Sequence, residues 1–90
     1  MNIEVLARRA QAERGTTYQL DMVIEECAEL IDSIQKYRRN RVDFVAVLEE
    51  GVDVELMIEQ LKIILGENTL WENMRARKLK LLEELLEGEV

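Results

Sequence analysis

Residues 49–66 read EEGVDVELMIEQLKIILG, and their apolar residues recur at helical spacing, which indicates an all-helical chain. They mark two nearly opposite faces of one predicted helix, and a third stripe between them carries Glu50 and Asp53. A helix that is apolar on two sides is usually buried. The stretch therefore predicts an all-α fold in which neighbours cover this helix. The apolar residues of the whole predicted helix, which begins before this stretch, are Val45, Val52, Leu56 and Ile63 on one face, and Val47, Val54, Ile58, Leu61 and Leu65 on the other.

Glycines and polar turns divide the chain into helices. Thr16 and Thr69 each begin a pattern typical of a capping box, which predicts that Gln19 and Glu72 complete the two boxes. Short loops between long helices favour antiparallel neighbours. We therefore expect a single domain over residues 1–90, an antiparallel helical bundle of about four helices that oligomerisation completes. The predicted helices span residues 2–14, 16–38, 42–65 and 69–86, with Gly15 and Gly66 ending the first and third and Asn40 or Arg41 preceding the third.

The composition of the 90 residues excludes several kinds of chemistry. There is no histidine, which removes Ser-His-Asp and Cys-His nucleophile systems, His-ligated zinc and the Glu-x-x-His ligands of di-iron bundles. The one cysteine, Cys27, follows the apolar spacing and is expected to pack as a small hydrophobe. A net charge of −7 argues against nucleic-acid binding. Without a leader or an apolar run of membrane length, we expect a cytoplasmic protein that has no membrane partner.

The second predicted helix has a broad apolar face and a separate stripe of mixed character. Asp21, Glu25 and Asp32 point away from the apolar face and are interpreted as solvated. Glu26 and Glu29 lie on the separate stripe, which could form the lip of a cleft. The apolar face consists of Leu20, Val23, Ile24, Cys27, Leu30, Ile31 and Ile34, and the separate stripe also contains Met22 and Ser33.

Two acidic pairs, Glu26 with Glu29 and Glu50 with Asp53, have i, i+3 spacing on successive helices, so each pair shares one helix face. Four such carboxylates can hold a hard cation such as Mg²⁺ or Mn²⁺. The competing interpretations are a salt-bridged structural role for the second pair and a solvated face for the first. Gly51 costs its helix about 0.5 to 1 kcal/mol relative to alanine, which indicates close approach by a helix or ligand.

Positive charge gathers in two clusters, and an acidic protein with basic clusters and a carboxylate cage can accept a polyphosphate when cations bridge the repulsion. The competing interpretation is solvated helix ends. Trp71 is a candidate to stack on a base, although core packing is the commoner role of an aromatic residue. The two clusters are Lys36, Arg38, Arg39 and Arg41, and Arg75, Arg77, Lys78 and Lys80.

The stretch from Tyr18 to Gly66 resembles the MazG-like all-α nucleoside triphosphate pyrophosphohydrolases, whose hallmark is EExxE followed by ExxD on the next helix. Residues 25–29 read EECAE and residues 50–53 read EGVD. The resemblance implies Mg²⁺-dependent hydrolysis of a nucleoside triphosphate to the monophosphate and pyrophosphate, by a homodimer or homotetramer. It implies Glu26, Glu29, Glu50 and Asp53 as metal ligands and, for Glu25, a role outside the ligand set or as an assisting base. Family members commonly carry a small residue such as alanine at the position of Gly51.

The functional hypothesis from sequence is thus a nucleotide pyrophosphohydrolase that uses Mg²⁺, or Mn²⁺ in its place. Two other functions stay open: a non-catalytic helical oligomerisation module and a nucleotide-binding regulator. The pattern does not indicate which base or sugar is preferred. The candidate substrate-binding residues are Lys36, Arg38, Arg39, Trp71, Arg75, Arg77 and Lys78.

Overall fold

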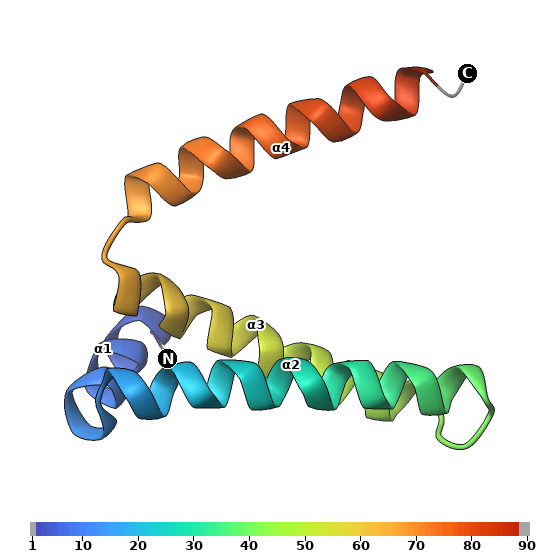
Figure 1. Ribbon diagram of the computed structural model, residues 1–90, viewed down its shortest axis with the longest axis horizontal. Helices are drawn as coiled ribbons and strands as arrows, with labels where there is room; N and C mark the ends of the chain where they lie inside the picture. Colours follow the sequence, from blue (N-terminus) through green and yellow to red (C-terminus); the bar gives the residue numbers. More distant parts are fainter. Residues whose placement is uncertain (1, 89–90) are drawn as a thin grey trace.

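The computed structural model describes residues 2–88, and the predicted all-α fold is confirmed, because this part of the chain forms four helices and no strand (Figure 1). None of the described helices is both long enough and apolar enough to span a membrane. The helices are α1 (Ile3–Arg14), α2 (Thr16–Arg38), α3 (Phe44–Leu65) and α4 (Asn68–Gly88).

Helix α1 is held by local polar contacts at its start and along its exposed side. The Asn2 side chain accepts hydrogen bonds from the Glu4 N–H at 2.8 Å and the Val5 N–H at 3.4 Å, which caps the first turn. Arg8 pairs with Glu4 at 3.0 Å, at i, i+4 spacing. The helix ends at Gly15 as predicted, and a φ of 82° there explains the choice of glycine.

The helix starts depart from the predicted capping boxes. Gly15 precedes α2 directly, so the Thr16 hydroxyl accepts from the Gln11 amide at 2.6 Å, and Gln19 turns towards α3 instead. The predicted box at Thr69 is wrong too, because α4 already begins at Asn68. Asp43, rather than Asn40 or Arg41, caps α3, and its carboxylate accepts from the Val45 N–H at 2.9 Å.

The α2–α3 loop and the end of α3 use left-handed backbone. Asn40 has a φ of 58°, a conformation that asparagine tolerates better than most residues. Gly66 ends α3 as predicted, with φ 68° and ψ 17°, and its N–H donates to the Lys62 carbonyl at 2.9 Å. These two turns fix the directions in which α3 and α4 leave.

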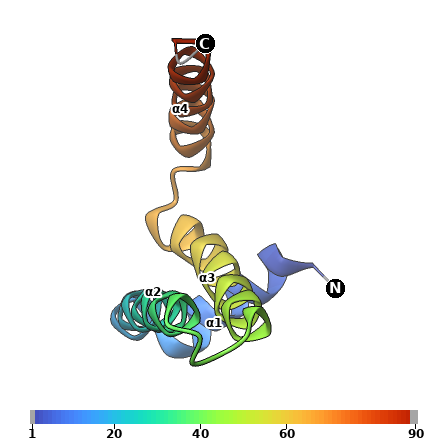
Figure 2. The ribbon, with the colours of Figure 1, turned by 90° about the vertical axis from the view of Figure 1, so that its right-hand side faces the viewer.

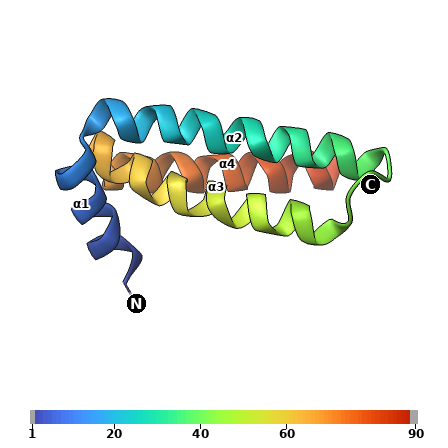
Figure 3. The ribbon, with the colours of Figure 1, turned by 90° about the horizontal axis from the view of Figure 1, so that it is seen from below.

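Helices α2 and α3 lie side by side and antiparallel, so the beginning of α2 is next to the end of α3 (Figures 1 and 3). Helix α1 packs across α3 at this end of the pair (Figure 3). The buried residues along these contacts are Ala7, Gln19, Ser33 and Met57. The Gln19 amide donates to the Gln60 side chain, whose own amide lies 3.2 Å from the Met57 sulfur. A polar pair, with Gln19 buried and Gln60 half-buried, therefore links α2 to α3 at the place where α1 also lies against α3.

Helix α4 leaves this three-helix unit and runs back along it at a distance (Figures 1 and 2). It contacts α3 near its own beginning, where the Lys62 ammonium lies over the Trp71 ring at 5.2 Å. The radius of gyration is 16.1 Å. A compact domain of this length would have about 12 Å, so the single chain is extended.

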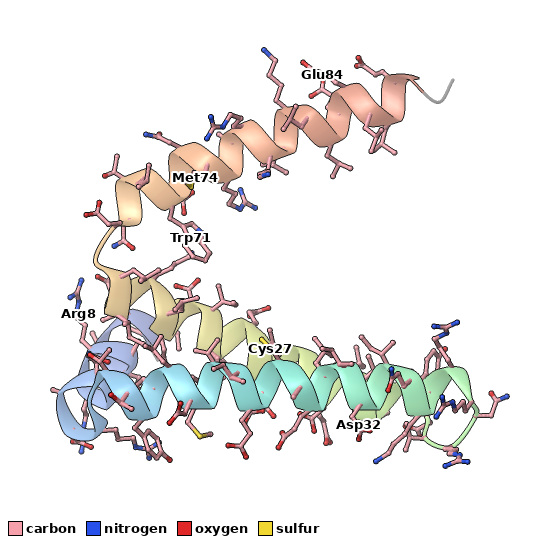
Figure 4. All side chains as sticks on the ribbon, in the orientation of Figure 1. Arg8, Cys27, Asp32, Trp71, Met74 and Glu84 are labelled. Atoms are coloured by element: carbon pink, nitrogen blue, oxygen red, sulfur yellow. The ribbon has the colours of Figure 1, made fainter. Side chains whose placement is uncertain are left out.

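The predicted burial of the third helix is wrong for the single chain, since Val52 and Leu56 are 53% and 40% exposed. The apolar face predicted for α2 is also largely uncovered, and Ile24 is 69% exposed. Contact with α3 instead follows a line through Gln19, Glu26 and Ser33, which are buried or half-buried. Cys27 is half-buried, forms no disulfide in the part of the chain that the structure describes, and lies on the side of α2 that is turned towards α4 (Figure 4).

No close approach occurs at Gly51 within the described chain, because a Cβ built there would meet nothing within 4 Å. We therefore expect Gly51→Ala to raise the free energy of unfolding by about 0.5 to 1 kcal/mol, through helix propensity. Denaturant unfolding of the two chains measures this difference. A destabilised variant would contradict the prediction and indicate that another chain packs closely against Gly51.

Candidate metal centre

Three of the four predicted ligands meet between α2 and α3. Glu26, Glu29 and Glu50 each offer a carboxylate oxygen, and these oxygens all lie within 4.8 Å of one another. One turn of α2 separates Glu26 from Glu29, and the side-by-side packing of α3 brings Glu50 to them. Oxygen ligands from two helices at this separation suit a hard divalent cation.

In this acidic cluster of Glu26, Glu29 and Glu50, two carboxylates have an oxygen without a hydrogen-bond partner within residues 2–88. One oxygen each of Glu26 and Glu50 is shielded from solvent and has no hydrogen-bond partner in the described part of the chain. Glu29 is exposed, so the cluster is closed on the helix side and open on the outer side. Because burying an uncompensated carboxylate is costly, a cation bound at the open side would satisfy the shielded oxygens.

Burial and charge repulsion make Glu26 and Glu50 hard to ionise. Burial raises the pKa of Glu26, and the charges of Glu29 and Asp53 raise it further. The pKa of Glu50 is raised by burial first, then by the charges of Glu29 and Asp53. When protonated, either side chain can donate a hydrogen bond to Glu29, which adds to both pKa increases. A divalent cation reverses this electrostatic balance, because it favours the charged form of every carboxylate that it contacts.

Asp53 lies on the rim of the cluster, not within it. Its side chain is exposed and is not one of the three that converge within 4.8 Å. Its charge nevertheless reaches Glu26 and Glu50, whose pKa values it raises. Glu25 is exposed, one turn before Glu29 on α2. The proposed roles of Asp53 as a ligand and Glu25 as a base stay predictions.

The first basic cluster lies towards the end of α2. Lys36 pairs with Asp32 at 2.8 Å and is seven residues beyond Glu29, which is about 10 Å along a helix. Seven residues also make nearly two turns, so Lys36 and Glu29 lie on the same side of α2. Arg38 and Arg39 are exposed and line a small hollow at the end of the helix with Gln35. Among these candidates, Lys36 is the one whose helix position fits a ligand held at the cluster.

The second basic cluster does not meet the acidic cluster in the same chain. Arg75 and Lys78 line a cavity of about 520 Å³ between α3 and α4, to which no residue of the acidic cluster contributes. On α3, Lys62 lines this cavity. Lys62 is twelve residues after Glu50, which corresponds to a net rotation of about 120° around the helix, so the two side chains leave α3 on different faces. Trp71 lies on the side of α4 that faces the hairpin formed by α2 and α3 (Figure 4). Asp32, by contrast, projects from the side of α2 that is turned away from α4 (Figure 4). Ile58 and Met74 complete the lining, and Arg77 is exposed.

Lys62 is a largely buried charged residue whose contacts sequence reasoning did not predict. Its side chain is 19% exposed, with the ammonium 3.3 Å from Glu59 and 3.9 Å from Glu72. It also covers the Trp71 ring. The contact with Glu59 is a local i, i+3 pair, but the contacts with Glu72 and Trp71 follow no local pattern, because they depend on the turn at Gly66 that brings the start of α4 back to α3.

Neither protein-family models, nor curated proteins, nor solved structures gave a significant match to this chain. The functional assignment therefore depends on the residues and their geometry.

The raised pKa values predict a pH dependence of stability and of its response to metal. Because Glu26 and Glu50 hold protons more tightly when folded, the unfolding free energy of metal-free protein should fall as pH rises from about 4.5 through the raised values. Over the same interval, added Mg²⁺ should stabilise increasingly, by about 2.7 kcal/mol at 100 times its Kd. Thermal unfolding from pH 4 to 8, with and without Mg²⁺, measures both trends. A metal effect independent of pH would contradict the assignment of the site.

Proposed function

We propose that this chain hydrolyses nucleoside triphosphates to the monophosphate and pyrophosphate in a reaction that depends on Mg²⁺, with Mn²⁺ able to replace it. The observation that carries the proposal is the convergence of Glu26, Glu29 and Glu50 within 4.8 Å, with two shielded oxygens lacking partners. The absence of histidine from the sequence adds to it, since oxygen-ligand metal chemistry is what the chain is well supplied to perform.

Each residue of the proposed site has a distinct task. Glu26 and Glu50 would hold the cation from the helix side, and Glu29 from the open side, with Asp53 joining from the rim. Glu25, exposed one turn before Glu29, would accept the proton of the attacking water. A divalent cation supplies charge neutralisation at the phosphate oxygens and acidifies a bound water. The net charge of −7 requires such neutralisation before a triphosphate can approach the cluster.

The outer phosphates would be bound by cationic side chains near the open side of the cluster. Lys36 is the first candidate, because it is on the same side of α2 as Glu29, about 10 Å further along. Arg38 and Arg39 would extend this surface towards the α2–α3 loop. Trp71 and the basic residues of α4 would reach an acidic cluster only if they came from another chain, since in their own chain they line a different face of α3.

A non-catalytic oligomerisation module is the second candidate, because the chain exposes large apolar side chains along α2, α3 and α4. Homo-oligomerisation as a dimer or tetramer is compatible with both functions, so association alone does not distinguish them. A nucleotide-binding regulator would bind triphosphates without turnover.

The deciding experiment is an assay of pyrophosphate release from standard and modified nucleoside triphosphates, with Mg²⁺, with Mn²⁺ and with chelator. In ¹⁸O-labelled water, attack at the α phosphorus should place the label in the monophosphate and none in pyrophosphate. Metal-dependent release with this labelling supports the proposal. Tight nucleotide binding without pyrophosphate release would favour the nucleotide-binding regulator. If the chain neither binds nucleotides nor releases pyrophosphate, the oligomerisation module is the remaining candidate.

A further inference from the structure

The single chain exposes far more surface than a compact protein of its mass. Its accessible area is 7,261 Å², whereas a folded monomer of 10.5 kDa exposes about 5,400 Å². The excess of about 1,800 Å² per chain is in the range that obligate homodimers bury, which runs from about 1,000 to 2,500 Å² on each partner. Within residues 2–88, the apolar residues that are buried are Ala7 and Met57. The chain alone therefore lacks most of a hydrophobic core.

Two surfaces on α4 differ in shape and in charge. The leucine groove, in the second half of α4, is lined by Leu79, Leu82 and Leu86 with Glu83 and Glu87 beside them. The basic cavity, between α3 and the first half of α4, has an apolar floor and three cations at its edge. Its lining residues are Ile58, Lys62, Trp71, Met74, Arg75 and Lys78.

We propose that two copies of this chain pair through α4 about a two-fold axis. The leucine side chains that line the groove of each chain then pack into the basic cavity of the other. With that axis perpendicular to α4, the two helices run antiparallel, and the first half of each α4 meets the second half of its partner. The leucines cover the apolar floor around Trp71 and Met74. The partner's Glu83 and the partner's Glu87 lie against Arg75 and Lys78.

A second copy fits this surface better than other occupants do. Each chain carries both the acidic and the basic half, so one contact made twice satisfies both surfaces, as a self-complementary interface requires. The chain's own α4 cannot do this, because its leucine groove and its basic cavity are parts of the same continuous helix. An unrelated partner would have to match both charge patterns by itself.

Sedimentation of the full chain at micromolar concentration tests the pairing. The unmodified chain should be at least a dimer, and Leu82→Glu should raise the dissociation constant at least about 30-fold, because a charge replaces a buried apolar anchor. If the chain forms a larger assembly, this variant should reduce it to a smaller one. The control is Leu48→Glu, which alters an exposed leucine on α3 and should leave association unchanged. A monomeric unmodified chain, or dissociation by Leu48→Glu and not by Leu82→Glu, would overturn the proposal.

A charge exchange tests the orientation and separates it from loss of folding. One variant carries Arg75→Glu with Lys78→Glu, and the other carries Glu83→Lys with Glu87→Lys. Each alone should associate more weakly, since like charges then face each other. An equimolar mixture should recover association, because both contacts of the mixed dimer are attractive. No recovery would overturn the antiparallel pairing. Neither experiment depends on catalysis, so the pairing can fail while the proposed function stands, and the reverse.

Discussion

Glu50→Gln is expected to lower the rate of metal-dependent pyrophosphate release at least about 100-fold. Glu50 is the carboxylate that α3 contributes to the acidic cluster, and its shielded oxygen has no hydrogen-bond partner in the described chain. An amide keeps the shape of the side chain but removes the charge that a hard cation requires. The rate with saturating Mg²⁺ measures the loss.

The same substitution should make the metal-free protein more stable at neutral pH, because it removes a charge that Glu29 and Asp53 repel. The opposite signs of the two effects separate loss of a ligand from loss of folding. The matched control is Glu55→Gln, a change of an exposed glutamate on the same helix, which should leave the rate within about twofold. Full activity in Glu50→Gln would remove Glu50 from the site.

Met57→Ala is expected to lower the free energy of unfolding by about 2 to 4 kcal/mol, the usual result of deleting a large buried side chain. Met57 is 8% exposed and lies on the same stripe of α3 as Glu50, one turn beyond Asp53. Its sulfur is 3.2 Å from the Gln60 amide that links α3 to α2. The loss would be a large fraction of the total stability of a small domain.

Denaturant unfolding measures this loss, and Leu48→Ala is the control. Leu48 is on the same helix but 58% exposed, so its truncation should cost less than about 0.5 kcal/mol. Equal effects at the two positions would contradict the burial of Met57 in the packing of α3.

Sequence reasoning identified the four helices and the ends of two of them, because Gly15 and Gly66 carry strong local signals. It placed the helix starts less well. Asp43 was missed although aspartate is a preferred N-cap, because the third helix was predicted to begin at Val42, which placed Asp43 inside the helix. The predicted box at Thr16 was wrong because Gly15 caps α2 directly and leaves the Gln19 side chain free to reach Gln60.

Periodicity also failed to show which apolar faces are covered within one chain. It placed Ile24 on the main core face of α2, whereas the contact with α3 follows Gln19, Glu26 and Ser33. A helical wheel shows which side chains are apolar, but not which neighbour covers them. The acidic pairs were easier to interpret, because i, i+3 spacing fixes each pair on one face and the hairpin then brings Glu50 to Glu26 and Glu29.

We propose that the acidic cluster of Glu26, Glu29 and Glu50 holds a divalent cation. Anomalous X-ray scattering from crystals of the unmodified chain grown with Mn²⁺ locates such an ion directly. We expect one or more Mn²⁺ ions coordinated by carboxylate oxygens of Glu26, Glu29 and Glu50, at about 2.0 to 2.3 Å, with Asp53 turned towards the same ions. An anomalous map with no peak at these carboxylates, at a Mn²⁺ concentration that saturates the thermal stabilisation, would contradict the proposal that this cluster binds a divalent cation.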